Sequence, residues 1–155
     1  MKITLLVGSI CIFQISFAQT ITNLSDADKT TAYVQAVTQY INTYKKDIHK
    51  TDTLFLEENS STTNSLPAIY RSTRLISLSK EQVKQLLNKR HSLNLYRMEQ
   101  VKCEDGIFSV TLTPLGCGFN KARNKYEYLY GGGYTAIFTF DGKKLVFQKI
   151  EEHGI

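Results

Sequence analysis

Aromatic and apolar positions at helical spacing predict one long helix near the N-terminus. Within residues 26–49, such positions begin at Tyr33 and Val37 and continue to Ile48. This spacing places the side chains on one face of an α-helix. Aspartates stand near the start of the segment and lysines near its end, which suits the helix dipole. We therefore expect an amphipathic helix over residues 26–49.

A second, shorter helix is predicted to begin at Ser79. Ser79 can cap the first turn, and Gln82 stands at the position from which its side chain reaches back. Leu78 and Val83 are spaced as a hydrophobic staple across the same start. We expect this helix to end near Lys89.

The remaining hydrophobic pattern predicts strands separated by turns. Asp105-Gly106 and Asp141-Gly142 are typical hairpin turns. The polar stretch 58–65 is predicted to be a surface loop. Pro114 is expected to end a strand and to open a loop over residues 115–125. The predicted extended segments are residues 51–57, 69–77, 93–102, 107–113, 126–140 and 144–151.

This order of elements predicts an α+β fold in a single domain over residues 19–155. We expect a long N-terminal helix packed on a curved, mainly antiparallel sheet, with a second short helix. The glycines at 131–133 can supply the bend. The element order resembles the cystatin-like and nuclear-transport-factor-2-like (NTF2-like) architecture, which implies a helix lying in the concave face of the sheet.

The first eighteen residues have the pattern of a signal peptide. Lys2 precedes an apolar run over residues 3–17, and small residues, Ser16 and Ala18, stand before Gln19. The run is shorter than the roughly 20 apolar residues of a membrane span. We expect cleavage between Ala18 and Gln19, no membrane span, and export to the periplasm or out of the cell. The leader and the C-terminal glycine-aromatic hairpin resemble those of small exported bacterial proteins of unknown function.

Composition narrows the function classes. The net charge of +5 is small and scattered, which does not favour nucleic acid as a partner. The sequence contains neither a phosphate-binding glycine loop nor a nucleophile elbow, and no cysteine–histidine spacing typical of zinc. We therefore expect no cofactor and no metal.

The cysteines leave one question open. Cleavage after Ala18 removes Cys11 and leaves Cys103 and Cys117 in a compartment that permits disulfides. The turn at Asp105-Gly106 pairs Cys103 with Phe108, and Cys117 then lies roughly 30 Å further along a straight strand. A disulfide requires Cα atoms within about 7 Å. A bridge and a straight hairpin exclude each other, and the sequence does not choose between them.

Tyrosines and basic residues near the C-terminus are candidates for ligand binding. Three tyrosines alternate onto one strand face, where they could stack on a sugar or another flat ligand, although ordinary packing is the commoner role. A neighbouring basic loop could hold an anion, although such loops are more often simply solvated. The candidates are Tyr126, Tyr128, Tyr130, Tyr134, Lys121 and Arg123.

Acid–base chemistry is the alternative. His49 and Asp52 lie close in sequence between the first helix and the next strand. The NTF2-like resemblance implies a His–Asp or acid–Tyr pair inside the cone. The full set of candidates is His49, His91, His153, Asp52, Glu57 and Glu58.

An inhibitor of cysteine proteases is a further alternative that the cystatin-like resemblance implies. Such inhibitors carry a hairpin resembling Gln-x-Val-x-Gly and a later Pro-Trp pair. Here Gln100-Val101-Lys102-Cys103 departs from that spacing, and the chain has no tryptophan.

The leading hypothesis is an exported, non-enzymatic domain that binds a small ligand or a protein partner through its sheet face. A small hydrolase or isomerase is the first alternative, and an immunity-type or inhibitor-like interaction protein is the second. For the second, Lys121, Arg123 and Lys125 would take part in capture. The oligomeric state stays open, although curved sheets of this kind often form homodimers.

Overall fold

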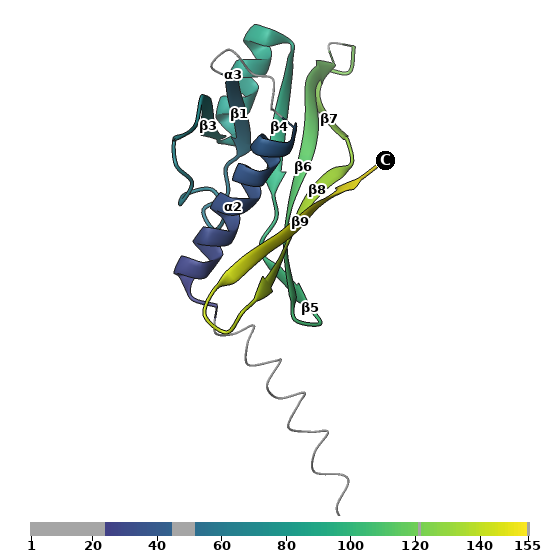
Figure 1. Ribbon diagram of the computed structural model, residues 1–155. Coiled ribbons are helices and arrows are strands. Elements are labelled where there is room, and N and C mark those ends of the chain that lie inside the picture. Colours follow the sequence, from purple (N-terminus) through teal and green to yellow (C-terminus); the bar gives the residue numbers. More distant parts are fainter. Residues whose placement is uncertain (1–23, 45–51, 121, 155) are drawn as a thin grey trace, which may run out of the picture.

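The computed structural model describes residues 24–44, 52–120 and 122–154 (Figure 1). The predicted leader with its cleavage point at Ala18 and Gln19 lies outside these residues, as do His49 and Lys121. Among the helices of the described ranges, none is long and apolar enough to cross a membrane.

The long helix α2 (Asp26–Tyr44) begins where the sequence predicts. Its first turn is closed by Ser25 and Asp28, because the Asp28 N–H donates to Ser25 Oγ over 3.2 Å and Ser25 Oγ donates to Asp28 Oδ2 over 2.6 Å. Residues 45–49 of the predicted helix are outside the described residues. The buried face comprises Ala32, Tyr33, Ala36, Val37, Tyr40 and Ile41.

The strands form one open, mixed sheet in the order β2-β3-β1-β4-β6-β8-β9, with β5 and β7 also paired to β6. β1 runs parallel to β3 and β4, and the other pairings are antiparallel. The α+β class is thus confirmed. The strands are β1 (Asp52–Glu57), β2 (Ile69–Tyr70), β3 (Thr73–Leu78), β4 (Ser92–Met98), β5 (Lys102–Glu104), β6 (Ile107–Asn120), β7 (Lys125–Tyr130), β8 (Gly133–Phe140) and β9 (Leu145–His153).

The long strand β6 holds the sheet together, as Figure 1 shows. On one edge it pairs with β5 near its start and with β4 over its second half. On the other edge it pairs first with β8 and then with β7. Four shorter strands are therefore aligned by one.

The two helices cover opposite faces of this sheet. On β6, Phe108, Val110 and Leu112 belong to the core beneath α2. Leu115 and Cys117 belong to a second core beneath α3 (Lys80–Arg90). Since side chains alternate along a strand, the even positions of β6 face α2 and the odd positions face α3.

The short helix α3 confirms the predicted capping box. Ser79 Oγ accepts from the Gln82 N–H over 3.3 Å, and Gln82 Oε1 accepts from the Ser79 N–H over 2.8 Å. The helix ends at His91, which adopts a φ of 63° and donates its N–H to the carbonyl of Leu87. Val83 and Leu87 are buried on its inner face.

The hairpin turn at Asp105-Gly106 is also confirmed. Both residues have positive φ, 50° and 77°, as a two-residue turn of this type requires. Cys103 pairs with Phe108 across the hairpin. At the second predicted turn, Asp141 Oδ1 accepts from the backbone N–H groups of Lys143 and Lys144, both over 2.9 Å.

The expected strand end at Pro114 is wrong, because β6 continues to Asn120 through most of the predicted loop. The Pro114 carbonyl accepts from the Gly131 N–H over 3.1 Å, so the side of the residue that lacks an N–H faces the passage between β7 and β8. The missing N–H therefore costs one bond where the pairing passes from β7 to β8 and none with β4, and the proline is tolerated inside the strand.

Other predicted boundaries also differ from the structure. The segment 69–77 is two strands joined by a turn at Arg71, whose φ is 53°. The strand predicted over 93–102 stops at Met98, whose carbonyl accepts from Thr62 Oγ1 over 3.5 Å. The stretch 58–65 is not a purely surface loop, because Thr62 is fully buried.

Candidate binding site

Three tyrosines line the α3 face of β7. Tyr126, Tyr128 and Tyr130 lie opposite Phe119, Cys117 and Leu115 of β6, on one face as predicted. The row is covered by α3 at one end only, where the Tyr126 hydroxyl donates to Asn88 Oδ1 over 3.2 Å. Tyr128 remains 42% exposed and Tyr130 59% exposed. The row therefore presents two accessible rings.

Arg97 and Glu57 close the other end of the row. The Arg97 guanidinium donates to both carboxylate oxygens of Glu57 and also to the Tyr130 hydroxyl over 3.4 Å. The Arg97 Cζ atom also lies 5.9 Å from the centroid of the Tyr130 ring, within the range of a cation–π contact. The bond to Glu57 is the main cause that raises the pKa of Arg97 above its usual value. Tyr130 thus rests on a fixed, charge-balanced support.

Sequence reasoning did not identify this pair as a unit. The sequence suggests Glu57 only as an acid–base candidate and gives no signal for Arg97. Strand alternation places Arg97 on the face of Leu95, and Glu57 on the face of Phe55. Only the pairing of β1 with β4, in which Phe55 lies opposite Leu95, brings the two charges together.

Cys117 lies beneath the row, opposite Tyr128. The thiol is buried, and this burial raises its pKa to about 11. Cys103 packs instead against the core on the α2 side, and both cysteines are free. The bridge that the sequence left open is therefore not formed, because the straight hairpin keeps Cys103 at the opposite end of β6.

Tyr134 does not join the row. It packs on the α2 face, with ring centroids 4.8 Å from Tyr40 and 4.5 Å from Tyr44. Leu115 pairs with Tyr130 of β7, and Leu112 pairs with Tyr134 of β8. The chain therefore advances three residues along β6 but four residues from β7 into β8. The extra residue falls among the glycines and turns the following side chains to the other face.

The basic loop also points away from the tyrosines. Arg123 Nη1 contacts Glu127 Oε1 at 3.4 Å, and the Arg123 N–H donates to Asn120 Oδ1 over 3.1 Å. Glu127 alternates with the tyrosines along β7 and so belongs to the opposite face. Arg123 is thus engaged with its own hairpin, and Lys121 lies outside the described residues.

The outer edge of β7 is unpaired in the described part of the chain, since β7 pairs with β6 alone. The Gly131 N–H donates to the Pro114 carbonyl, which extends the β6–β7 register by one pair. In an antiparallel ladder the hydrogen-bonded pairs alternate, so Glu127 and Leu129 bond inward to β6. The backbone groups of Tyr126, Tyr128 and Tyr130 therefore point outward.

The acid–base candidates do not gather in one place. Glu57 is paired with Arg97, and His91 ends α3. His153 Nε2 lies 3.1 Å from Thr135 Oγ1 on the β8–β9 arm. The backbone N–H of Thr53 donates to Asp52 Oδ1 over 2.7 Å. Glu58 is exposed. Within ranges 24–44, 52–120 and 122–154, no cluster of three or more His, Cys, Asp or Glu side chains could hold a metal.

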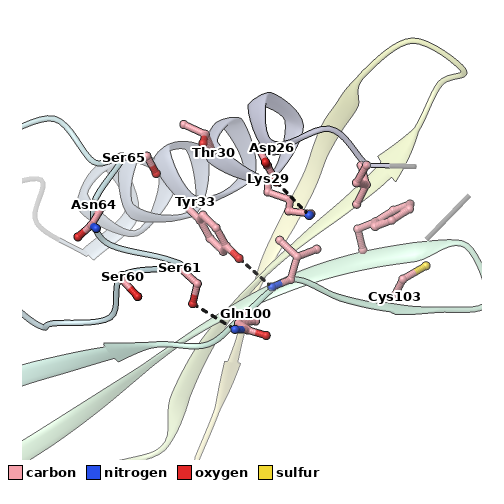
Figure 2. Close-up of a pocket in the computed structure, with 13 residues that line it drawn as sticks. Asp26, Lys29, Thr30, Tyr33, Ser60, Ser61, Asn64, Ser65, Gln100 and Cys103 are labelled. Carbon is pink, nitrogen blue, oxygen red and sulfur yellow. Dashed lines mark hydrogen bonds and ion pairs between the residues drawn. The ribbon is translucent and has the colours of Figure 1, made fainter. Parts of the chain in front are cut away.

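A polar groove of about 510 Å³ opens beside the first turns of α2 (Figure 2). The Tyr33 hydroxyl accepts from the Val101 N–H over 3.4 Å, and Gln100 Nε2 donates to Ser61 Oγ over 3.1 Å. Lys29 is neutralised by Asp26 at 3.2 Å. Each of these side chains is already bonded to a neighbour, so a ligand that used them would have to compete with existing bonds. Gln100 and Val101 of the inhibitor-like segment line this groove.

No protein-family model matches this chain, and comparison with the curated proteins and with the solved structures also gave no match.

Proposed function

We propose that this chain is an exported, non-enzymatic interaction domain that binds an extended segment of a partner protein along β7. The observation that carries the proposal is the free edge of β7, where tyrosine side chains are exposed and the backbone groups of the same residues point outward. Strand addition to such an edge provides affinity through main-chain bonds and specificity through alternate side chains.

The other ends of the sheet are protected in the ways that natural sheets use. β2 is only two residues long. β9 carries Lys149, Glu151 and Glu152, and such charges discourage pairing with another strand. β7 contains no proline and pairs regularly with β6; its charged residues, Lys125 and Glu127, direct their backbone groups inward to β6, and the residues whose backbone groups point outward are all tyrosines. Its accessible edge is therefore the one best suited to accept a strand.

The side chains on β7 suit an apolar or aromatic segment. Leu129 is 75% exposed on one face, and Tyr128 and Tyr130 are exposed on the other. A strand added next to β7 would place alternate side chains beside the tyrosines and beside Leu129. Arg97 would orient Tyr130 for this contact without offering a free charge.

The proposal also includes export of the protein and a cystatin-like or NTF2-like architecture. The leader pattern in residues 1–18 supports export to the periplasm or beyond. The long helix against one face of an open, mainly antiparallel sheet supports a cystatin-like or NTF2-like relationship. The parallel pairing of β1 with β3 and β4 is a feature that the sequence did not predict.

The test is a selection from a phage-displayed library of random linear peptides, followed by calorimetry with the selected peptides. We expect Tyr128→Ala and Tyr130→Ala each to weaken binding at least about tenfold. Phe140→Ala, which removes a partly exposed aromatic ring at the end of β8, is the control and should leave affinity unchanged. Peptides whose affinity responds to Gln100→Ala but not to Tyr128→Ala would place binding in the groove and contradict the proposal.

A further inference from the structure

We infer that the partner strand is β7 of a second copy, and that the two strands pair antiparallel about a two-fold axis at Tyr128. The two sheets then become one continuous sheet. This inference rests on the proposed function, because it uses the same free edge of β7 and names its occupant.

Backbone complementarity and the length of β7 together fix the register. Tyr126, Tyr128 and Tyr130 are the residues of β7 whose N–H and C=O groups point outward. An axis at Tyr128 places Tyr128 opposite its own copy and Tyr126 opposite Tyr130 of the other copy. Each such pair exchanges two N–H···O bonds. An axis at Tyr126, Glu127, Leu129 or Tyr130 would instead leave at least one of these tyrosines opposite a residue beyond the ends of β7.

Side chains agree with this register. The tyrosines of both copies fall on the same face, so that aromatic rings meet in cross-strand pairs. On the other face, Lys125 lies opposite Gly131 of the second copy, where the absence of a side chain leaves room. Leu129 lies opposite Glu127 of the second copy and loses part of its large exposure to water.

Charge does not oppose the approach of two copies. The Glu127 carboxylates are the acidic groups nearest the axis. Each is already compensated in its own hairpin by Arg123 at 3.4 Å and Lys125 at 3.9 Å, and also accepts from Asn120 Nδ2 over 3.1 Å. Tyrosine occupies every position of β7 whose backbone groups point outward. Two copies of this edge can therefore pair both their backbone groups and their aromatic side chains, and this favours a second copy over an unrelated strand.

Disulfide trapping tests the register in the full chain with Cys11→Ser, Cys103→Ser and Cys117→Ala, because Cys117 lies opposite Tyr128 on β6 and would otherwise compete for the new thiol. Directly opposed residues of a hydrogen-bonded pair have Cα atoms about 5.5 Å apart, within the range for a disulfide. Tyr128→Cys should therefore form a covalent dimer on mild oxidation. Tyr126→Cys and Tyr130→Cys should each fail alone and should cross-link when mixed.

Sedimentation velocity of the unaltered chain over a range of concentrations supplies the second measurement. We expect a reversible dimer, whose dissociation constant rises at least about tenfold in Tyr128→Pro, because this change removes an outward N–H and leaves the bonds to β6 in place. Cross-linking of Tyr126→Cys alone would overturn the register.

The two proposals fail in different ways. A monomer at every concentration, without cross-linking of Tyr128→Cys, would overturn the self-pairing. If that monomer still bound selected peptides in a Tyr128-dependent way, the proposed function would stand. If it bound none, both would fail.

Discussion

Gly132 lies where the backbone leaves almost no room for a side chain. It has a φ of +63°, and a Cβ there would lie 2.2 Å from the His153 carbonyl oxygen. We expect Gly132→Ala to destabilise the protein by more than about 2 kcal/mol, since left-handed backbone alone costs an alanine about 1–2 kcal/mol and the end of β9 must also move. Urea unfolding measures the loss.

Gly142→Ala is the matched control. Gly142 also has a positive φ, +90°, but an added Cβ there meets no atom within 4 Å. It should therefore show the backbone cost without the clash. Equal losses in the two variants would contradict a close approach of β9 to Gly132.

The two thiols should react at very different rates. Cys103 is half-buried, whereas Cys117 is buried and its pKa is raised to about 11 by that burial. The thiolate is the reactive form, so near pH 8 Cys117 has little of it and is also shielded. In the Cys11→Ser, Cys103→Ser chain, we expect labelling by a thiol reagent at least about a hundredfold slower than that of Cys103 in the Cys11→Ser, Cys117→Ser chain.

Labelling of the unaltered chain after unfolding in urea without reductant tests whether both thiols are free. Both Cys103 and Cys117 should then become labelled, because neither is in a disulfide. If neither reacted until a reductant was added, the free thiols and the straight hairpin would both be contradicted.

The candidate residues were predictable from sequence only as far as strand alternation holds. The common face of Tyr126, Tyr128 and Tyr130 follows from period-two alternation alone. Tyr134 looked equivalent because the glycines hide one extra residue in the passage to β8. Arg97 and Glu57 meet only through the pairing of distant strands, which no local pattern encodes.

At the scale of elements, the cap of α3 gives a local prediction. Ser79 satisfies the N–H of Gln82, and Ser79→Ala should cost about 1 kcal/mol of unfolding free energy. Ser92→Ala, at an exposed position where β4 begins, is the control and should change stability by less than about 0.5 kcal/mol. A thermal or urea midpoint for Ser79→Ala equal to that of the unaltered chain would contradict the role of the capping box.

Elements set by neighbouring residues were predicted well, and those set by distant partners were not. The start of α2, the cap of α3 and the Asp105-Gly106 turn depend on contacts within a few residues. The continuation of β6 through Pro114 depends on where β7 gives way to β8. The parallel position of β1 likewise depends on strands that follow it in sequence.

At the scale of the whole molecule, β6 joins two cores that lie on opposite faces of one sheet. Leu112 is buried on the α2 side and Leu115 on the α3 side, with only two residues between them. Neither core can lose its strand without exposing the other. The exposed tyrosines of β7 lie on the α3 face and β7 pairs with β6, so the geometry of the binding edge depends on the integrity of both cores.

This arrangement predicts a single cooperative unfolding transition. Leu112→Ala and Leu115→Ala, matched buried leucines on the two faces, should each cost about 2–5 kcal/mol. Far-ultraviolet circular dichroism follows the whole fold, and labelling of Cys117 follows the α3 side alone. We expect the urea midpoints of both signals to fall together in Leu112→Ala, although Cys117 lies on the opposite face, because the strand that carries Leu112 also carries Cys117. Loss of circular dichroism in two steps, with Cys117 protected through the first, would show instead that the two cores unfold separately and that β6 does not couple them.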